Sequence, residues 1–263
     1  MTSSPTKVSI TATLDYQLDR PADVLLAIEA IPMPDQQLET DLLTVRGSGP
    51  LTPVAGVDGQ GRRTWLHADG ALSICYTATA AINRPAIVIA GLDVTPLRAL
   101  PPAYIAYLMP SRYCQSDQLQ HFVTTRFGEA DKGRQVLDMA DWVHANLDYV
   151  PGSSNGATTA TDTFLSRQGV CRDYAHLLIA LCRAADIPAR MVSAYALGLD
   201  PPDFHAVVEV YLAGGWHLVD PTRLVPETNL VRIAVGRDAT DVGFMTIFGT
   251  ARMLAQSVTV SRA

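Results

Sequence analysis

The sequence predicts an α+β protein in which a β-rich N-terminal part precedes a mixed core of helices and antiparallel strands. The periodicity of the hydrophobic residues indicates this organisation. Near the N-terminus, apolar and polar residues alternate, as in strands with one buried face. Farther along the chain, apolar residues recur every three or four positions, as in helices, and the alternation returns near residue 205. With 263 residues, of which 48% are hydrophobic and 17% charged, the chain can form a large core.

The clearest predicted strand covers residues 8–18, where every second residue from Val8 to Leu18 is apolar. The same alternation occurs at residues 24–28 and 72–78, and turn-forming residues lie between them. We therefore expect residues 1–95 to form an all-β, sandwich-like domain.

Pro96, Pro101, Pro102 and Pro110 lie in or next to residues 97–110, which we therefore expect to be a connecting segment that cannot sustain a helix. An apolar stripe between residues 136 and 147 then predicts a helix, and the polar residues 152–160 predict an exposed loop. The segment that begins at Cys171 is apolar on nearly every side, so we expect a buried helix. Its first residue is a cysteine.

A predicted strand at residues 190–197 is followed by a hairpin. In one arm, apolar residues alternate from Ala206 to Leu212, and the other arm runs from Trp216 to Asp220 after two glycines. These strands complete an antiparallel sheet. We assign residues 96–225 to the core and residues 226–263 to a C-terminal, strand-rich extension.

His205 begins the first arm of this hairpin and Asp220 ends the second. An even-numbered loop would place both side chains on the same face of the sheet. Direct pairing requires a turn centred between Leu212 and Ala213, because a turn centred on the following glycine pair separates His205 and Asp220 by about 13 Å. We therefore expect an earlier turn or a bulge.

Cys171 is a candidate nucleophile because a helix N-terminus stabilises a thiolate. Gly169 permits a close approach of the backbone, and the main-chain N–H of Cys171 could face a developing oxyanion. Considered alone, a cysteine is more often a small apolar residue of the core, which is the interpretation we give to Cys75, Cys114 and Cys182. The four cysteines are widely spaced, which indicates free thiols.

Three motifs in order resemble those of the transglutaminase-like superfamily. They are Gly169-Val-Cys-Arg-Asp-Tyr-Ala-His, Asp203-Phe-His-Ala-Val-Val-Glu-Val and Gly215-Trp-His-Leu-Val-Asp-Pro-Thr-Arg, within a resemblance that covers about residues 100–225. Carried over by motif, the nucleophile of the family falls on Cys171, its histidine on His205 and its aspartate on Asp220. The segments Ser111–Asp117 and Gly236–Asp238 also resemble bacterial members, without an assigned chemistry.

The resemblance implies a papain-like core and a thiol-dependent amide hydrolase, a cysteine peptidase or amidase that acts through a thioester. Two alternatives are transglutaminase-type acyl transfer to an amine and a non-catalytic binding or scaffold module on the same fold. Hydrolysis is favoured because bacterial members are often hydrolytic and no acidic loop suggests calcium sites. Tyr149 is a candidate for the second oxyanion donor because its hydroxyl group can donate a hydrogen bond.

The composition and the remaining motifs predict neither a metal nor another cofactor. A zinc site from Cys171, His176, Cys182 and His205 would lack the usual paired-ligand spacing. A net charge of −6 without a basic run argues against nucleic acid as a partner. No apolar run is long enough to span a membrane, and no secretory signal is recognisable, so we expect a cytoplasmic protein. The expected partner is a peptide, protein or small-molecule amide substrate; the sequence does not determine the oligomeric state.

Overall fold

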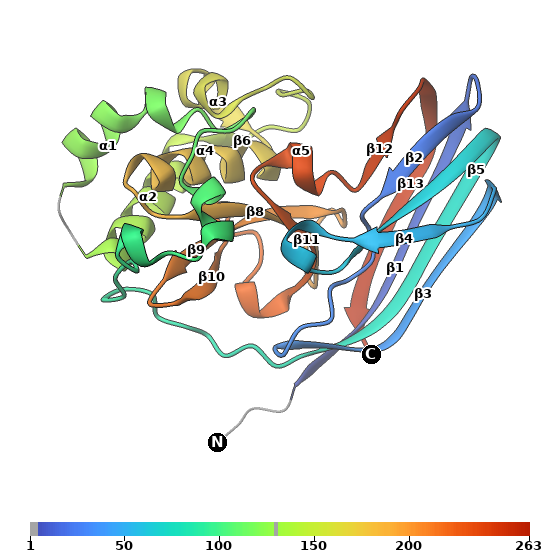
Figure 1. Ribbon diagram of the computed structural model, residues 1–263, viewed down its shortest axis with the longest axis horizontal. Coiled ribbons are helices and arrows are strands. Elements are labelled where there is room, and N and C mark those ends of the chain that lie inside the picture. Colours follow the sequence, from blue (N-terminus) through green and yellow to red (C-terminus); the bar gives the residue numbers. More distant parts are fainter. Residues whose placement is uncertain (1–4, 129–130) are drawn as a thin grey trace.

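A computed structural model describes residues 5–128 and 131–263 and consists of two lobes (Figure 1). One lobe is a strongly curled antiparallel sheet, and the other combines helices with a four-stranded antiparallel sheet. This confirms the predicted α+β class. The prediction that no secretory signal is present concerns the first residues of the sequence, and residues 1–4 lie outside the described range. Within that range, no helix has both the length and the apolar character needed to cross a membrane.

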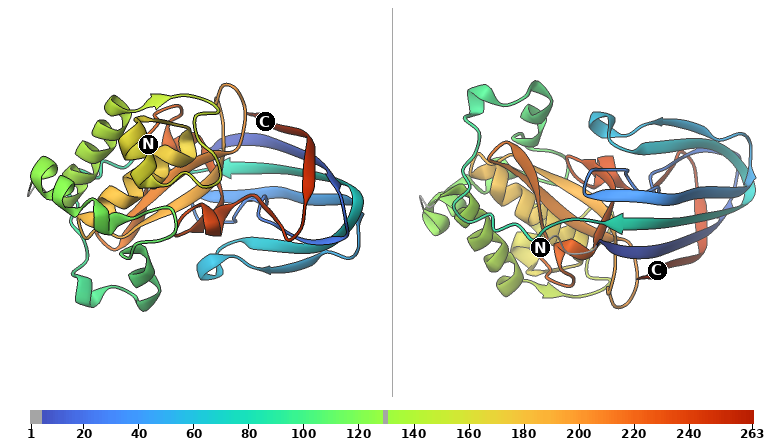
Figure 2. Two further views of the ribbon diagram at one scale, coloured as in Figure 1. Left: turned by 90° about the horizontal axis from the view of Figure 1, so that it is seen from above. Right: turned by 90° about the horizontal axis from the view of Figure 1, so that it is seen from below.

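The curled sheet contains seven strands. They are β1 (Thr6–Leu18), β2 (Ala22–Leu26), β3 (Gln36–Ser48), β4 (Thr52–Ala55), β5 (Arg62–Ile82), β12 (Met245–Ile247) and β13 (Ala251–Arg262). In β1, every second residue from Val8 to Leu18 is buried, as its alternation predicts. We expected two facing sheets, as in a sandwich. A single curled sheet is possible because β5 is 21 residues long and pairs with β1, β2, β3 and β4 (Figure 2).

The segment 226–263, which we expected to be an extension, is shared between the two lobes. Strand β11 (Leu230–Gly236) pairs with β8 (Ala189–Ala196) in the core sheet. Strand β12 pairs with β2, and β13 pairs with β1 from one end to the other. The C-terminal strands therefore tie the first strand of the chain to the core.

The core sheet has the order β10-β9-β8-β11, where β9 is His205–Leu212 and β10 is Gly215–Val219. The helices are α1 (Gln120–Phe127), α2 (Lys132–Asn146), α3 (Ala160–Ser166), α4 (Cys171–Ala184) and α5 (Ala239–Val242). Two further strands, β6 (Asp148–Tyr149) and β7 (Gln168–Gly169), form a small parallel pair. Helix α4 lies at the centre, and all its residues from Asp173 to Arg183 are buried. The predicted buried helix is thus confirmed.

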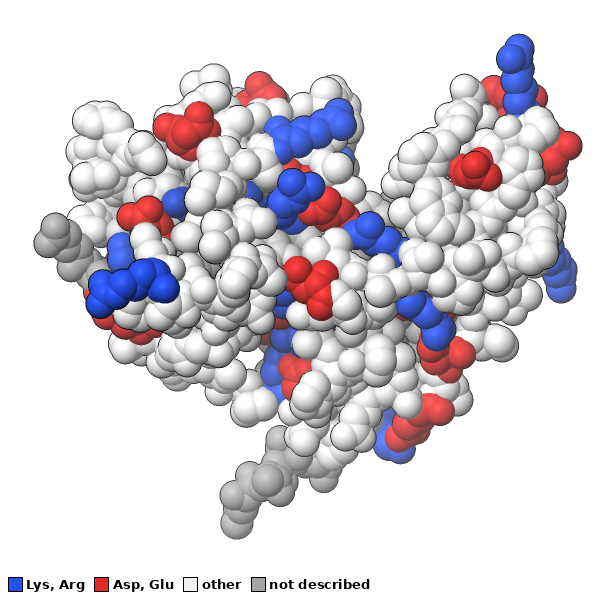
Figure 3. Space-filling view, viewed as in Figure 1, with Lys and Arg blue, Asp and Glu red and all other residues white. Residues whose placement is uncertain are grey.

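A buried ionic network joins the two lobes. Glu209 on β9 accepts hydrogen bonds from Arg190 Nε at 2.9 Å and from Arg232 Nε at 2.7 Å. Arg232 also contacts Asp35 of the N-terminal lobe, with 2.9 Å between Nη1 and Oδ2. The Arg190 guanidinium lies 4.0 Å from the centroid of the Trp216 ring. These contacts fix the lobes relative to each other. Figure 3 shows interspersed acidic and basic side chains on one face of the molecule.

Candidate active site

The hairpin between β9 and β10 sets the relative position of His205 and Asp220. Its two-residue turn consists of Ala213 (φ 48°) and Gly214 (φ 79°), the positive φ values typical of a type I′ turn. The strands pair from Gly215 opposite Leu212 to Val219 opposite Val208. Extending this register places Asp220 two residues from the position opposite His205, on the same face. The turn lies one residue before the glycine pair, as the expectation of an earlier turn required, but it does not pair His205 and Asp220 directly; a diagonal contact joins them instead.

The imidazole of His205 and the carboxylate of Asp220 form a buried hydrogen-bonded pair. Nε2 of His205 lies 2.8 Å from Oδ2 of Asp220, and the two residues are 2% and 4% exposed. The second carboxylate oxygen accepts hydrogen bonds from the main-chain N–H of Thr222 at 2.9 Å and from its hydroxyl group at 2.7 Å. Both oxygens are thus engaged, and the histidine ring is held in one orientation.

The Cys171 thiol lies beside this pair at the beginning of α4. Burial lowers the pKa of His205, but the hydrogen bond with Asp220 and the proximity of Cys171 outweigh burial and raise the pKa to about 9. Since Nε2 contacts Asp220, Nδ1 is the ring nitrogen available to the thiol. Nδ1 makes no hydrogen bond of regular geometry with the described residues. The raised pKa of His205 favours the protonated form of the ring beside the thiol.

Helix α4 begins without a side chain that caps its first N–H groups. Val170 is the N-cap residue, and its apolar side chain cannot accept a hydrogen bond from the helix. The main-chain N–H of Val170 itself donates to Oδ2 of Asp173 at 2.8 Å. The main-chain N–H of Cys171, at the first position of the helix, lies adjacent to its own thiol.

Tyr149 lies next to Cys171 because β6 and β7 pair in parallel, with Tyr149 opposite Gly169. Burial raises the pKa of Tyr149 to about 12; the charge of Cys171 adds to the increase, and a hydrogen bond with the Cys171 main chain opposes it. The hydroxyl group is thus close to both the thiol and the main-chain N–H of Cys171. The oxyanion role of Tyr149 stays a prediction.

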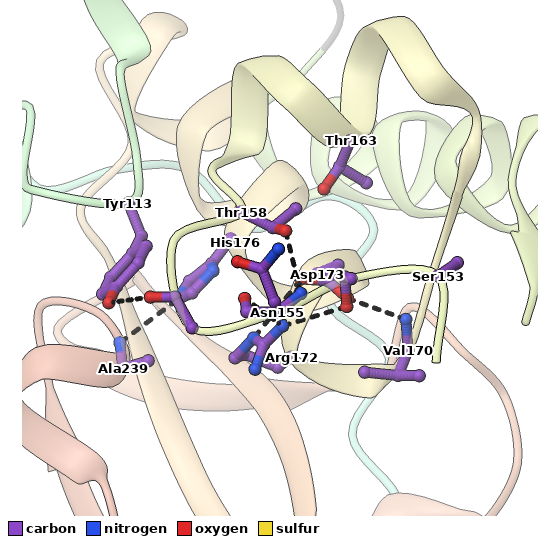
Figure 4. Close-up of polar contacts among 12 residues, drawn as sticks. Tyr113, Ser153, Asn155, Thr158, Thr163, Val170, Arg172, Asp173, His176 and Ala239 are labelled. Carbon is purple, nitrogen blue, oxygen red and sulfur yellow. Dashed lines mark hydrogen bonds and ion pairs between the residues drawn. The ribbon is translucent and has the colours of Figure 1, made fainter. Parts of the chain in front are cut away.

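Residues next to the thiol hold the preceding loop against α4 (Figure 4). The Asp173 carboxylate is fully buried and accepts hydrogen bonds from Val170 and from the hydroxyl group of Ser154. The Arg172 guanidinium donates to Ser154 Oγ and to the Asn155 carbonyl, both at 2.9 Å, and to Asp173 Oδ1 at 3.1 Å. Asp173 therefore anchors the loop in addition to compensating the helix dipole.

The two segments without an assigned chemistry, Ser111–Asp117 and Gly236–Asp238, meet in the structure. Oδ2 of Asp238 accepts a hydrogen bond from the main-chain N–H of Tyr113 at 3.0 Å, and Oδ1 accepts one from Thr240 at 2.9 Å. Asp238 thus caps α5 and fixes Tyr113 at the same time.

His176 supports Tyr113 from within α4. The two rings stack with 4.9 Å between centroids, and the Tyr113 hydroxyl donates to the Gly156 carbonyl at 2.6 Å. Nε2 of His176 accepts a hydrogen bond from the main-chain N–H of Ala239 at 3.1 Å. Because burial lowers the pKa of His176 to about 4, this histidine is neutral and supports the wall of the site.

A cleft of about 520 Å³ opens beside Cys171 and His205 and is lined by residues of both lobes. On one side, Phe204 stacks on Phe244 with 4.8 Å between ring centroids. Gln256 of β13 also lines this side. Sequence reasoning missed Phe244 and Gln256, because they lie in the segment expected to be an extension and carry no local signal of a site.

Known families and solved structures include relatives of this chain. A family model described as the transglutaminase-like superfamily matches residues 120–221. A solved structure from Cytophaga hutchinsonii, named a "putative cysteine protease", is 37% identical and superimposes with a TM-score of 0.91. The match covers 99% of this chain and 91% of that chain. The chain belongs to the transglutaminase-like superfamily.

This member of the transglutaminase-like superfamily also has mycobacterial relatives. An uncharacterized protein of Mycobacterium leprae is 32% identical over 148 residues, which cover 51% of this chain and 52% of that protein. An uncharacterized protein of Mycobacterium bovis is 34% identical over 124 residues, 41% of this chain and 39% of that protein. The matches thus span about half, or less, of the length of these curated relatives.

Proposed function

We propose that this protein is a thiol-dependent amide hydrolase, a cysteine peptidase or amidase. Cys171 is the nucleophile, His205 the acid and base, and Asp220 the residue that orients His205. The observation that carries the proposal is the buried pair of His205 and Asp220, 2.8 Å apart, beside the thiol at the beginning of α4. Nucleophile, base and orienting carboxylate in this order are what covalent amide cleavage requires.

In the first half of the reaction, the Cys171 thiolate attacks the carbonyl carbon of the amide. The negative charge that develops on the carbonyl oxygen is stabilised by the N–H of Cys171 and the hydroxyl group of Tyr149. His205 gives its proton to the nitrogen of the leaving group, and the C–N bond breaks. A neutral amine leaves, and the acyl group remains on the sulfur as a thioester.

In the second half, water attacks the thioester carbonyl while His205 accepts its proton. The C–S bond breaks, the carboxylic acid departs, and the thiolate and imidazolium are restored. Asp220 stabilises the positive charge of His205 whenever the imidazole ring is protonated. An amine in place of water would yield a new amide, as in a transglutaminase.

Trapping the acyl-enzyme tests this function. The full-length protein is incubated with a library of peptides and simple amides, with and without added amine, and its intact mass is measured. We expect acyl adducts on the wild type and on a Cys75→Ala control, whose thiol lies on β5, but none on Cys171→Ala. A Cys171→Ala protein that retains every amidase and acyl-transfer activity of the parent would contradict the proposal.

The reactivity of the thiols provides a second test without a known substrate. At pH 6 an ordinary cysteine with a pKa of ~8.5 is almost entirely protonated and reacts slowly. We expect iodoacetamide to label Cys171 faster than Cys75, Cys114 and Cys182. Equal, slow labelling of all four thiols would favour a binding or scaffold module.

A further inference from the structure

The carboxylate of Asp203 lies on the cleft. This exposed residue comes two positions before His205 and lines the same cleft. Its Oδ1 atom accepts hydrogen bonds from the main-chain N–H of Phe204 at 2.7 Å and from Gln256 Nε2 at 2.8 Å. Both donors are uncharged, and no ion pair of Asp203 is found in residues 5–128 and 131–263. The carboxylate is thus positioned without being neutralised.

The cationic side chain that lines the cleft does not cancel this charge. Arg172 forms an ion pair with the fully buried carboxylate of Asp173, at 3.1 Å, and binds the loop through Asn155. The imidazolium of His205 is similarly offset by Asp220, at 2.8 Å. The carboxylate of Asp203 is therefore a negative group on the cleft wall that has no ion-pair partner among the described residues.

Next to Asp203, the cleft is apolar. Phe204 and Phe244 stack at 4.8 Å with nearly parallel rings, 7° apart. Met191 and Met245 line the same cleft. An apolar side chain can replace water on this surface, and removing water also strengthens the attraction between Asp203 and a cation.

We propose that the cleft selects amide substrates that carry an ammonium group beside an apolar side chain, and that Asp203 is the specificity-determining residue. This inference rests on the proposed amide chemistry at Cys171. Opposite charge lowers the free energy of the bound cation, and the uncompensated carboxylate disfavours acidic substrates. A free amino terminus next to an aromatic or aliphatic residue has this chemistry.

Charged thiol reagents test the electrostatic effect of Asp203 on reagents that approach Cys171, without the need for a known substrate. The full chain reacts with aminoethyl, sulfonatoethyl or methyl methanethiosulfonate, which are cationic, anionic and neutral, and peptide mass spectrometry measures modification of Cys171. The variant Asp203→Asn removes the charge but keeps an oxygen that can accept from Phe204 and Gln256. Asp69→Asn is the matched control: this exposed residue on β5 does not line the cleft.

We expect Asp203→Asn to slow the cationic reagent and accelerate the anionic reagent, each by roughly fivefold, the size of effect expected for one unit charge on the same cleft in a medium between protein and water. The neutral reagent and the Asp69→Asn variant should show the wild-type rates. An unchanged ratio of cationic to anionic rates in Asp203→Asn, or an equal change in Asp69→Asn, would overturn the inference.

Protection of the thiol tests the substrate class. Phenylalaninamide and N-acetylphenylalaninamide compete with the neutral reagent at Cys171 and differ in the ammonium charge. In the wild type, the concentration that halves the labelling rate of Cys171 should be roughly fivefold lower for phenylalaninamide than for N-acetylphenylalaninamide. In Asp203→Asn, the two compounds should halve this rate at equal concentrations. Equal concentrations in the wild type would contradict the inference. Slow modification of Cys171 by the neutral reagent, no faster than Cys75, would instead contradict the proposed function.

Discussion

Replacing Gly169 by alanine should destabilise the protein at the beginning of α4. The added Cβ would lie 2.6 Å from Cβ and 3.0 Å from Oδ2 of Asp173. Asp173 cannot move away without loss, because it is fully buried and its carboxylate accepts hydrogen bonds from Val170 and Ser154 and pairs with Arg172. The backbone before the nucleophile must therefore shift, or these contacts must break.

The size of the effect follows from these contacts. Overpacking in a closely packed region costs ~1–3 kcal/mol. Loss of one hydrogen bond to the buried carboxylate adds about 1.5–3 kcal/mol. Alanine also restricts the unfolded chain more than glycine does, which offsets ~0.4–1 kcal/mol of this loss in the free energy of unfolding. We expect the free energy of unfolding to fall by roughly 3 kcal/mol, with slower alkylation of Cys171 because the thiol shifts with the helix.

Urea denaturation of Gly169→Ala measures this loss. Gly156→Ala is the matched control, because no atom lies within 4 Å of its added Cβ and its φ is not positive. The control should remain within ~0.5 kcal/mol of the wild type. A Gly169→Ala protein that is as stable as the control would refute the reasoning.

One titration and three substitutions test the site and the ionic network between the two lobes. A pKa of about 9 for His205 predicts an NMR titration midpoint near pH 9. The contribution of protonated His205 to the free energy of unfolding should be complete below pH ~6.5 and should be lost as the pH rises through 9. A midpoint near 6.5 would contradict the pairing of His205 with Asp220. Asp220→Asn should lower this midpoint and slow amide cleavage by about 10³–10⁴-fold; an unchanged midpoint would argue against the contact. Tyr149→Phe should reduce kcat by ~10²-fold with little change in KM, whereas an unchanged kcat would exclude the oxyanion role. Glu209→Gln removes the carboxylate that two buried arginines share and should cost ~3–5 kcal/mol by urea denaturation; a loss below ~1 kcal/mol would contradict this.

Local periodicity was sufficient to predict the elements that carry the nucleophile and the base. The apolar segment after Gly169 indicated the buried helix α4, and the alternation after His205 indicated β9. Both patterns depend on which face of a single element is buried, and the sequence encodes that face directly. The motifs added Asp220 to this pair.

The hairpin register could not be predicted to the residue. Three consecutive positions, Ala213 to Gly215, can form the turn, and choosing among them requires knowing that Ala213 adopts a positive φ. A shift of the turn by one position moves the residue opposite His205 by two positions along β10. Only the folded sheet showed that a diagonal contact joins His205 to Asp220.

By itself, the sequence determined the fold class and the identity of the three residues proposed for catalysis, because these follow from local patterns and motifs. Only the tertiary structure decided what surrounds them. Strand β13 pairs with β1 across nearly the whole length of the chain, and Gln256 on that strand holds Asp203 at the cleft. Such contacts depend on the packing of distant segments, and no periodicity within either segment specifies its partner.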